Sequence, residues 1–476
     1  MPQNRAHATP GFGIRAGSRF LEQFRNPVRA ARSGRAIPSG SARSEPWRRQ
    51  RPALFPGGRT QSIAAFGART YEEPIVYSKN ALIEAALVSD PDAIKHVLLD
   101  NAANYRKGQQ SKRLTEPMLG NGLVLAEGAS WRFQRRTAAP MFQMRYIAGT
   151  AAAMAAAVDD MLARWSVLGE GAVVDVAQEM TRVTYDIISR TMFSSDVDLP
   201  FEQMEIAFAN YLETLGRADI PALFLPTWFP TPNRLKGQPT LKFLKREIGA
   251  IIARRRAQIA AEPQSAPNDL LTLLLTAKDP EGGVVFGDAE VFDNVMTFIF
   301  AGHETTANAM AWTFYLLSQY PDWDARVADD SSAPGDTTRM VIEEAMRLYP
   351  PAPFISRQAI APDVVGGFPI GAGTSVTVCS WVVHRHKTLW DDPDYFNPLR
   401  FAPGAREKIH RFAYLPFGAG PRICIGMGFA MQEATIILSR VARRFRLTLL
   451  PGHPVEAQAR VTVRPKYGLK MRVERR

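Results

Sequence analysis

One cysteine set among glycines is the feature of the sequence with the clearest chemistry. Residues 417–426 read FGAGPRICIG, and Cys424 is one of two cysteines in a chain of 476 residues. A helical pattern follows this stretch, so the thiol lies just before a helix N-terminus, where backbone N–H groups stabilise a thiolate. Glycine lets backbone approach a flat, bulky group closely, and Arg422 can reach an anion beside the sulfur. The stretch therefore indicates a thiolate that binds a metal or an electrophile.

Two interpretations of this stretch compete. A lone cysteine in a glycine-rich turn is usually a small buried residue, whereas a haem offers a thiolate a metal and offers an arginine two carboxylates. The spacing favours the haem, because it resembles the haem-binding loop of the cytochrome P-450 family. This resemblance implies a haem b whose iron is bound by Cys424, with contacts from Phe417, Gly418, Gly420, Arg422 and Gly426.

A long apolar stretch, FIFAGHETTANAMAWTFYLL, occupies residues 298–317. It lies within a helical pattern that runs from about Asp288 to Gln319. His303, Glu304 and several threonines interrupt its centre, so we expect a core helix rather than a membrane span.

Part of that helix resembles the helix that crosses the open face of the haem in the same family. The resemblance implies that Ala301 and Gly302 leave room for O2, and that Glu304 and Thr305 relay protons. The alternative is that Thr305 bonds to a carbonyl of its own helix while Glu304 forms a salt bridge.

Basic residues at two further places resemble the family's contacts to the haem carboxylates. Trp131 and Arg135 in WRFQRR are four residues apart, so they share one helical face. Arg357 in FISRQ matches another arginine of this kind. Together with Arg422, the resemblance places three arginines around two carboxylates.

The stretch EEAMRLYPP at 343–351 places Glu344 and Arg347 three residues apart on a helix that two prolines end. Such a pair is normally a surface salt bridge. The resemblance implies instead a buried pair behind the haem, joined by Arg400. One departure is HRHK at 384–387, where the family usually has Asp after His-Arg; its two histidines lack a third ligand for a metal.

The remaining patterns predict a mainly α protein with a small β portion. Apolar residues recur at helical spacing in 148–168, 241–261 and 269–278, while β-branched residues and glycines in 363–383 indicate a hairpin or short sheet. The resemblance implies one large haem-binding domain with a long central helix, covering 71–476.

The N-terminal segment 1–70 differs from the rest in composition. It holds 13 Arg and no Lys against Glu22 and Glu45, so 13 minus 2 gives +11 of the formal charge of +12. We expect this segment to be disordered and dispensable for chemistry; a transit peptide or a membrane-touching arm is the alternative. Two cysteines cannot form a disulfide framework, which favours a cytoplasmic protein.

The resemblance implies a haem-thiolate monooxygenase. One oxygen atom of O2 would enter a C–H bond or double bond of a lipophilic molecule, and the other would leave as water. The sequence has no GxGxxG motif after a strand and no cysteines for an iron–sulfur cluster, so electrons must come from a separate ferredoxin or flavodoxin with its NAD(P)H reductase. We expect a monomer without a nucleic-acid partner. The alternatives are a peroxygenase driven by H2O2 and a non-catalytic protein that binds haem or lipophiles.

The family resemblance also indicates which segments line the substrate pocket. They are mostly apolar, which argues for a lipophilic substrate: 105–128, 220–233, Phe298, Phe300, 351–354 and a turn near Tyr467. The aromatic stretch 220–233 has two other interpretations, core packing and weak contact with a membrane surface. RLYPPAP and GNGLVLAEGASWRFQRR resemble the branch of bacterial type that contains fatty-acid and terpenoid hydroxylases.

Overall fold

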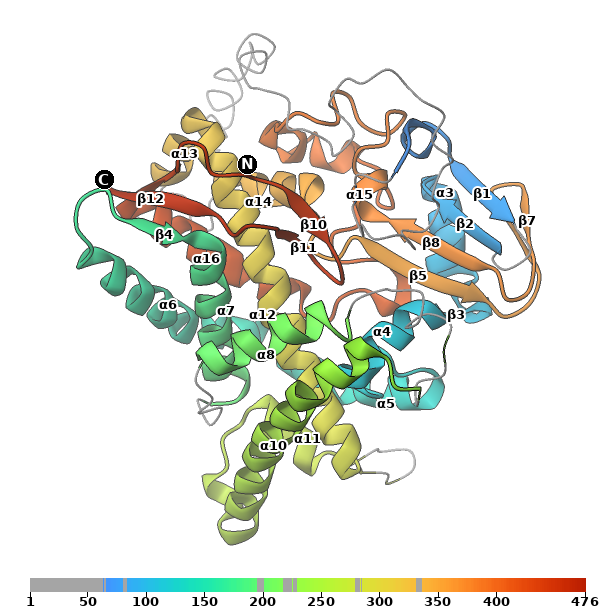
Figure 1. Cartoon of the computed structure of the whole chain (residues 1–476), viewed down its shortest axis with the longest axis horizontal. Helices are drawn as coiled ribbons and strands as arrows, with labels where there is room; N and C mark the ends of the chain where they lie inside the picture. Colours follow the sequence, from blue (N-terminus) through green and yellow to red (C-terminus); the bar gives the residue numbers. More distant parts are fainter. Residues whose placement is uncertain are drawn as a thin grey trace, which may run out of the picture.

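The computed structural model describes most of the chain after the N-terminal segment. The described residues are 63, 66–79, 84–194, 201–216, 225, 229–278, 283, 285–330 and 336–476. Within them the fold is mainly helical, with small sheets at the edges (Figure 1). The predicted fold class is therefore confirmed.

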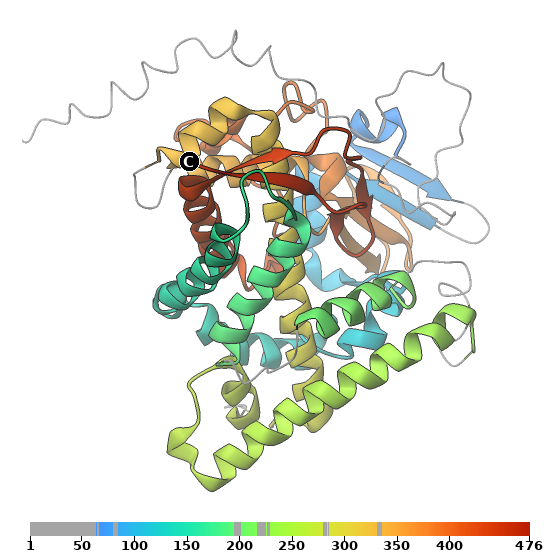
Figure 2. The same cartoon turned by 60° about the vertical axis from the view of Figure 1, so that its left-hand side comes forward.

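Helix α12, Asp288–Gln319, runs through the middle of the molecule in both views (Figures 1 and 2). Its bounds are those predicted from the sequence, and Glu290 caps its start by accepting a hydrogen bond from the Gly287 N–H at 3.1 Å. Residues on nearly all its faces are buried, which explains its apolar sequence. No helix in the described part of the chain has the length and low polarity needed to cross a bilayer.

Further helices surround α12. Helix α7 lies along it, and α14 and α16, which come from the C-terminal half of the chain, also pack against it. The predicted helices at 148–168, 241–261 and 269–278 correspond to α6, α10 and α11. Helix α10 begins earlier than predicted, because Thr231 caps the amide of Arg234 and Pro232 occupies the first turn. The bounds are α4 Gln109–Leu119, α5 Gly128–Ala138, α6 Met144–Ser166, α7 Val176–Met192, α8 Phe201–Glu213, α10 Pro232–Ala261, α11 Leu270–Thr276, α13 Pro321–Ala328, α14 Asp336–Leu348, α15 Ser380–Val383 and α16 Met427–Arg444.

The largest sheet has the order β1-β2-β8-β5-β3, in which only β2 and β8 pair in parallel. A three-stranded sheet β4-β12-β9 and the two hairpins β6-β7 and β10-β11 complete the β portion. The β pattern predicted at 363–383 becomes β6, β7 and β8 as far as Cys379, but its last four residues form the short helix α15 instead. The bounds are β1 Ile75–Lys79, β2 Glu84–Val88, β3 Tyr105–Lys107, β4 Val173–Asp175, β5 Phe354–Ala359, β6 Asp363–Val365, β7 Phe368–Ile370, β8 Ser375–Cys379, β9 Phe445–Leu449, β10 Ala457–Ala459, β11 Val463–Pro465 and β12 Lys470–Arg475.

The packed core begins before residue 71. Ile63 and Phe66 are 3% and 7% exposed, and Thr70 is also buried. The residues before 63 lie outside the described part of the chain, so the prediction that 1–70 is disordered is not tested for them.

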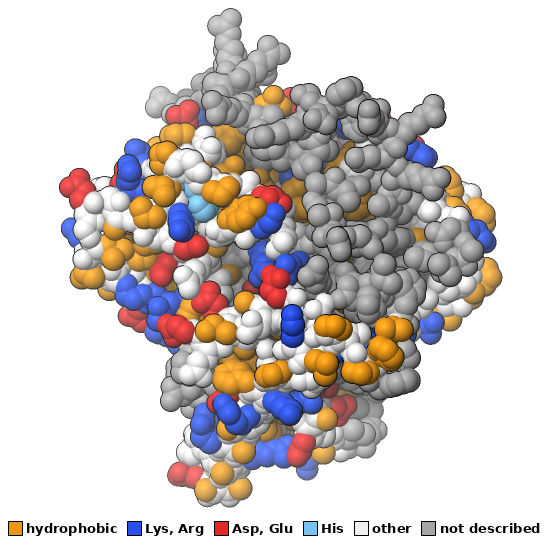
Figure 3. Space-filling model, viewed as in Figure 1, with side chains coloured by type: hydrophobic (Ala, Val, Ile, Leu, Met, Phe, Trp, Pro, Cys, Tyr) orange, Lys and Arg blue, Asp and Glu red, His pale blue; other side chains and the backbone are white. Residues whose placement is uncertain are grey.

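Helix α10 carries a concentration of positive charge. Its one acidic residue is Glu247, and its exposed cations are Lys236, Lys242, Lys245, Arg246, Arg254 and Arg256. Figure 3 shows blue side chains gathered over the lower part of the molecule, where α10 lies. The sequence left three interpretations of 220–233: a pocket lining, core packing or contact with a membrane surface. Most of this stretch lies outside the described residues; Phe229, which is described, is exposed.

Candidate active site

Residues 417–426, the cysteine loop, include the short 3-10 turn Gly420–Arg422. Cys424 lies between this turn and the start of α16, and the position just before a helix is the predicted one. The Cys424 N–H donates a hydrogen bond to the Phe417 carbonyl at 2.9 Å, which closes the loop. Solvent reaches the Cys424 side chain, although the surrounding protein shields it from most of the bulk water. This burial raises the pKa of the thiol, while the Gly426 N–H and the positive charge of Arg135 act in the opposite direction.

The glycines of the loop have separate structural reasons. Gly418 and Gly420 both have φ of 71°, which favours glycine. A Cβ on Gly420 would overlap the Leu98 carbonyl of the π-helical turn His96–Asp100, so close packing onto that turn also requires glycine there. A Cβ on Gly426 would lie 3.6 Å from the Phe142 ring and 3.9 Å from the Cys424 sulfur, so its absence leaves room beside the thiol.

Arginines tie the loop to helix α5 and the segment before it. Arg135 donates to the Ile423 carbonyl at 2.8 Å, and Arg422 donates to the Ala126 carbonyl at 2.6 Å. The Arg422 guanidinium also stacks on Trp131, with its central carbon 4.1 Å from the ring centroid. Trp131, Arg135 and Arg422 are thus brought together, as the sequence predicted.

Lys107 joins this group, although sequence reasoning missed it. It lies on β3 directly opposite Arg357 on β5. Burial and the charges of Arg357 and Arg422 lower the pKa of Lys107 to about 7, and burial and Arg357 lower the pKa of Arg422 to about 10. The charge on Lys107 is therefore poorly compensated by the protein.

The charges of this cluster allow a test of whether a haem fits. Glu127 is the carboxylate that acts favourably on Lys107, Arg357 and Arg422. Among the described residues, four cations, the fourth being Arg135, thus face one carboxylate beside an accessible thiol. A group that carries a soft metal and two carboxylates matches both the sulfur and the excess positive charge. The residues present therefore fit a haem.

The predicted residues of α12 are arranged as follows. The Thr305 hydroxyl donates to the Ala301 carbonyl at 2.8 Å, which is the bond expected under the alternative interpretation. The Glu304 carboxylate forms no salt bridge with any residue that the structure describes; its Oε1 accepts from Asn308 Nδ2 at 3.1 Å and from Thr462 Oγ1 at 2.9 Å. A Cβ on Gly302 would lie 2.7 Å from Ile188 of α7, so this glycine allows α7 to pack closely.

Phe142 links the cysteine loop to α12. Its ring lies beside Gly426 and stacks on Phe298 with 5.7 Å between ring centroids. Phe300, the other α12 aromatic proposed to line a pocket, is buried against Phe208 of α8. Tyr467, also proposed there, is 47% exposed and bonds to Glu456. The described contacts therefore place Phe298, but not Tyr467, near the loop.

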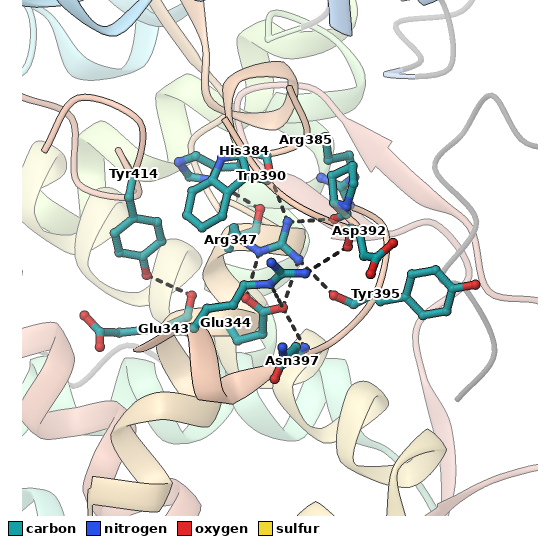
Figure 4. Close-up of polar contacts among 12 residues, drawn as sticks. Glu343, Glu344, Arg347, His384, Arg385, Trp390, Asp392, Tyr395, Asn397 and Tyr414 are labelled. Atoms are coloured by element: carbon teal, nitrogen blue, oxygen red, sulfur yellow. Dashed lines mark hydrogen bonds and ion pairs between the residues drawn. The ribbon is translucent and has the colours of Figure 1, made fainter. Parts of the chain in front are cut away.

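The Glu344–Arg347 pair is fully buried, as the resemblance implied (Figure 4). Arg347 donates to both oxygens of Glu344, at 2.7 and 2.8 Å. Its other N–H groups donate to the carbonyls of His384, Pro393 and Tyr395, so all five donors are used. Arg400 joins the pair at 3.6 Å from Glu344. This cluster fixes the segment around 393–397 to α14.

His384 continues this network toward the cysteine loop. Its Nε2 accepts a hydrogen bond from the Leu415 N–H at 2.8 Å, and its Nδ1 lies 3.1 Å from the Arg347 carbonyl, to which it donates. Burial and the charge of Arg347 lower the pKa of His384 to about 3, so it stays neutral. His386 bonds separately, to Thr388 and to the Glu73 carbonyl. Both histidines of the HRHK sequence therefore form hydrogen bonds that stabilise the fold.

The described geometry agrees with sequence comparison. The profile of the cytochrome P-450 family matches residues 58–472 of the chain. The chain belongs to the cytochrome P-450 family. It is a haem-dependent P-450 monooxygenase.

Similar proteins come from plants and bacteria. Protein LUTEIN DEFICIENT 5, chloroplastic, of Arabidopsis thaliana is 32% identical, over 82% of this chain and 70% of its own length. Pentalenene oxygenase of Streptomyces avermitilis is 31% identical, over 81% of this P-450 and 87% of its own length. The crystal structure of the cytochrome P-450DA haem domain superimposes with a TM-score of 0.74 at 25% identity, covering 85% of this chain and 90% of that one.

Proposed function

We propose that Cys424 is the iron ligand and that Lys107, Arg135, Arg357 and Arg422 hold the haem carboxylates. The observation that carries this proposal is that, among the described residues, four cations face a single carboxylate beside an accessible thiol. Charge-assisted hydrogen bonds of this type contribute about 1.5–3 kcal/mol each. Trp131, Ala301, Phe417, Gly418, Gly420 and Gly426 would complete the contacts to the cofactor.

When bound, a haem with a thiolate ligand supplies the activation of O2 that inserts one oxygen atom into the substrate. The protein's own groups supply the rest. The Gly426 N–H and Arg135 favour the negative charge on Cys424. Glu304 and Thr305 hold and transfer protons on α12, the Thr305 hydroxyl starting from its bond to the Ala301 carbonyl. Gly302 lets α7 pack tightly against this part of the helix.

We propose a terpenoid as the substrate class. Pentalenene oxygenase and two Streptomyces melanosporofaciens proteins, cyclooctatin synthase and cyclooctat-9-en-7-ol 5-monooxygenase, are each 31% identical to this chain. Their names describe oxidation of hydrocarbon-rich ring systems, and the buried Phe298 and Phe300 suit such a substrate. These three relatives support terpenoids over fatty acids within the branch of bacterial type that the sequence resembles.

We propose a ferredoxin or flavodoxin, with its NAD(P)H reductase, as the electron donor. Arg132 and Arg136 are exposed on α5, the helix whose Trp131 and Arg135 lie against the cysteine loop. An acidic electron carrier that docks there would come close to the haem. The cytoplasmic location and the monomeric state stay predictions.

The first experiment compares the absorption spectra of the reduced protein with and without carbon monoxide. We expect a strongly red-shifted Soret band that Cys424→Ala abolishes; retention of the band in Cys424→Ala would contradict the assignment of the ligand. Terpenoids, fatty acids, steroids and aromatic compounds are then compared by the type I spectral shift. A shift confined to fatty acids would overturn the terpenoid proposal. Turnover with H2O2 that outpaces turnover with the reductase would favour the peroxygenase alternative.

A further inference from the structure

Glu304 is held from outside its own helix by one hairpin. Thr462 lies at the turn between β10 and β11 and is 3% exposed. Its hydroxyl donates to Glu304 Oε1 at 2.9 Å, and Asn308, one helical turn along α12, donates to the same oxygen at 3.1 Å. Within the described part of the chain, Glu304 Oε2 receives no hydrogen bond from protein. The carboxylate is therefore fixed through one oxygen, and the other remains available to exchange a proton.

The hairpin is itself anchored on both sides. Val463 accepts a bond from Trp312 Nε1 of α12 at 3.1 Å, and its N–H donates to the Pro351 carbonyl at 2.9 Å. These two bonds seat the hairpin on the core beside Thr462. The position of the Thr462 hydroxyl is thus determined by the fold rather than by a flexible loop.

A second anchor reaches the end of α8. Arg460 donates to the Leu212 carbonyl at 2.9 Å and pairs with Glu213 at 2.6 Å. Arg464 pairs with the same carboxylate at 3.3 Å, and the charge of Glu304 also acts on Arg464. The hairpin turn therefore connects the C-terminal end of α8 with Glu304.

We propose that Thr462 is a positioning residue for Glu304, and that the ion pairs of Glu213 with Arg460 and Arg464 hold Thr462 in place from α8. The inference rests on the proposed role of Glu304 in proton transfer. An ionised carboxylate has about four acceptor sites, so two donors on Oε1 select one orientation without saturating the group. Among the described residues, loss of the Thr462 bond leaves Asn308 as the one side chain that donates to the carboxylate, and lets the carboxylate turn away from that orientation.

The test measures H2O2 released per NADPH oxidised in the full-length haem protein. A plant-type [2Fe–2S] ferredoxin and its NADPH reductase supply electrons, and the assay is run without substrate and with the terpenoid ketone β-ionone as the probe. Thr462→Val keeps the shape of the side chain and removes the hydroxyl. We expect it to raise the peroxide ratio about two- to tenfold, the change that loss of one hydrogen bond corresponds to. Thr462→Ser should restore the ratio.

Two control variants separate this effect from others. Thr313→Val removes a buried hydroxyl that bonds only within α12, to the Ala309 carbonyl, and should leave the ratio unchanged. An equal rise in Thr313→Val would mean a general loss of packing and would overturn the proposal. Glu304→Gln should raise the ratio. A normal ratio in Thr462→Val with a raised one in Glu304→Gln refutes the positioning role alone, whereas a normal ratio in Glu304→Gln refutes the proposed role of Glu304 as well.

The α8 anchor has its own matched pair of variants, which also covers the case in which Thr462→Val does not fold. Glu213→Gln removes the charge shared by Arg460 and Arg464, while Glu202→Gln removes an α8 charge that pairs with Arg182 instead. We expect Glu213→Gln to raise the peroxide ratio about twofold and Glu202→Gln to leave it unchanged. Equal ratios in the two variants would show that the ion pairs of Glu213 with Arg460 and Arg464 do not hold Thr462 in place.

Discussion

Individual side chains at the site combine a solvent-accessible thiol with an excess of cations, and the charges of the thiol and of the Lys107 amine respond to pH with opposite effects on haem binding. Burial raises the pKa of Cys424, so the haem-free protein keeps the thiol proton and must lose it when iron binds. Lys107, with a pKa lowered to about 7, loses its charge as the pH rises. Rising pH therefore strengthens the sulfur–metal contribution and weakens the contribution of Lys107.

This opposition gives a prediction for haem binding. The affinity of the haem-free protein for haem should rise from about pH 6 to about pH 8, by up to about tenfold per unit, because fewer thiols remain protonated. Cys424→Ala should show a flat or falling dependence over the same range, since only cations such as Lys107 still titrate. The measurement is a haem titration at constant ionic strength. Parallel curves for the two proteins would contradict the assignment of Cys424.

A second prediction at this scale concerns Thr305. Its hydroxyl bonds to the Ala301 carbonyl, so its removal deletes a proton donor without opening a large cavity. Thr305→Ala should retain haem and the red-shifted carbon monoxide band but release most of the electrons as H2O2. The measurement is product formed per NADPH oxidised, with Thr313→Val as the control. Normal coupling in Thr305→Ala would show that the proton-relay assignment is wrong.

At the scale of elements, α14 and the segment after β8 are held together by a buried charge pair. Every N–H group of Arg347 donates a hydrogen bond to Glu344 or to one of three backbone carbonyls. His384 bonds both to the Arg347 carbonyl and to the N–H of Leu415, two residues before Phe417, so it connects this network to the start of the cysteine loop. A pair of this kind organises backbone that has no regular secondary structure of its own.

Removal of the acidic partner tests this organisation. Glu344→Gln leaves Arg347 buried without a counter-charge, which should cost about 3–5 kcal/mol of unfolding free energy. Glu202→Gln, which breaks an exposed pair with Arg182, should cost less than about 1 kcal/mol. Thermal unfolding and haem content measure both variants. Equal stability in the two would mean that the buried pair contributes little.

At the scale of the whole molecule, the Arg-rich segment and the folded body overlap by a few residues. Ile63 and Phe66 are buried in the main core, although they lie within the segment 1–70 that composition separates from the body. We propose that the catalytic domain includes Ile63 and Phe66 in addition to residues 71–476.

Two truncations distinguish these boundaries. Deletion of residues 1–57 should leave thermal stability and monooxygenase activity unchanged. Deletion of residues 1–70 should lower the unfolding free energy by about 3–6 kcal/mol, because two large apolar side chains are lost at roughly 1.5–3 kcal/mol each. Unfolding curves of the two truncated proteins measure the difference. Loss of activity in the shorter deletion would show that the basic segment takes part in function.

Local patterns predicted the elements that depend on neighbouring residues, such as α12 with its unchanged bounds and the Glu344–Arg347 pair at helical spacing. They could not predict Lys107 or Thr462, because their positions depend on strand register and on contacts between distant segments. Gly420 shows the same limit, since the need for glycine there depends partly on the Leu98 carbonyl. Three-dimensional neighbours, rather than residue type, determine these positions.

The cysteine loop takes its partners from the opposite end of the chain. Gly420 packs on Leu98, Arg422 bonds to Ala126, and Arg135 bonds to Ile423. A nascent chain thus holds the partners long before the ribosome adds the thiol, and these contacts can form only after Cys424 has been synthesised. Haem binding through Cys424 therefore requires the loop to join segments that were synthesised much earlier. Two separately produced fragments, divided between these regions, would bind haem only after they associate.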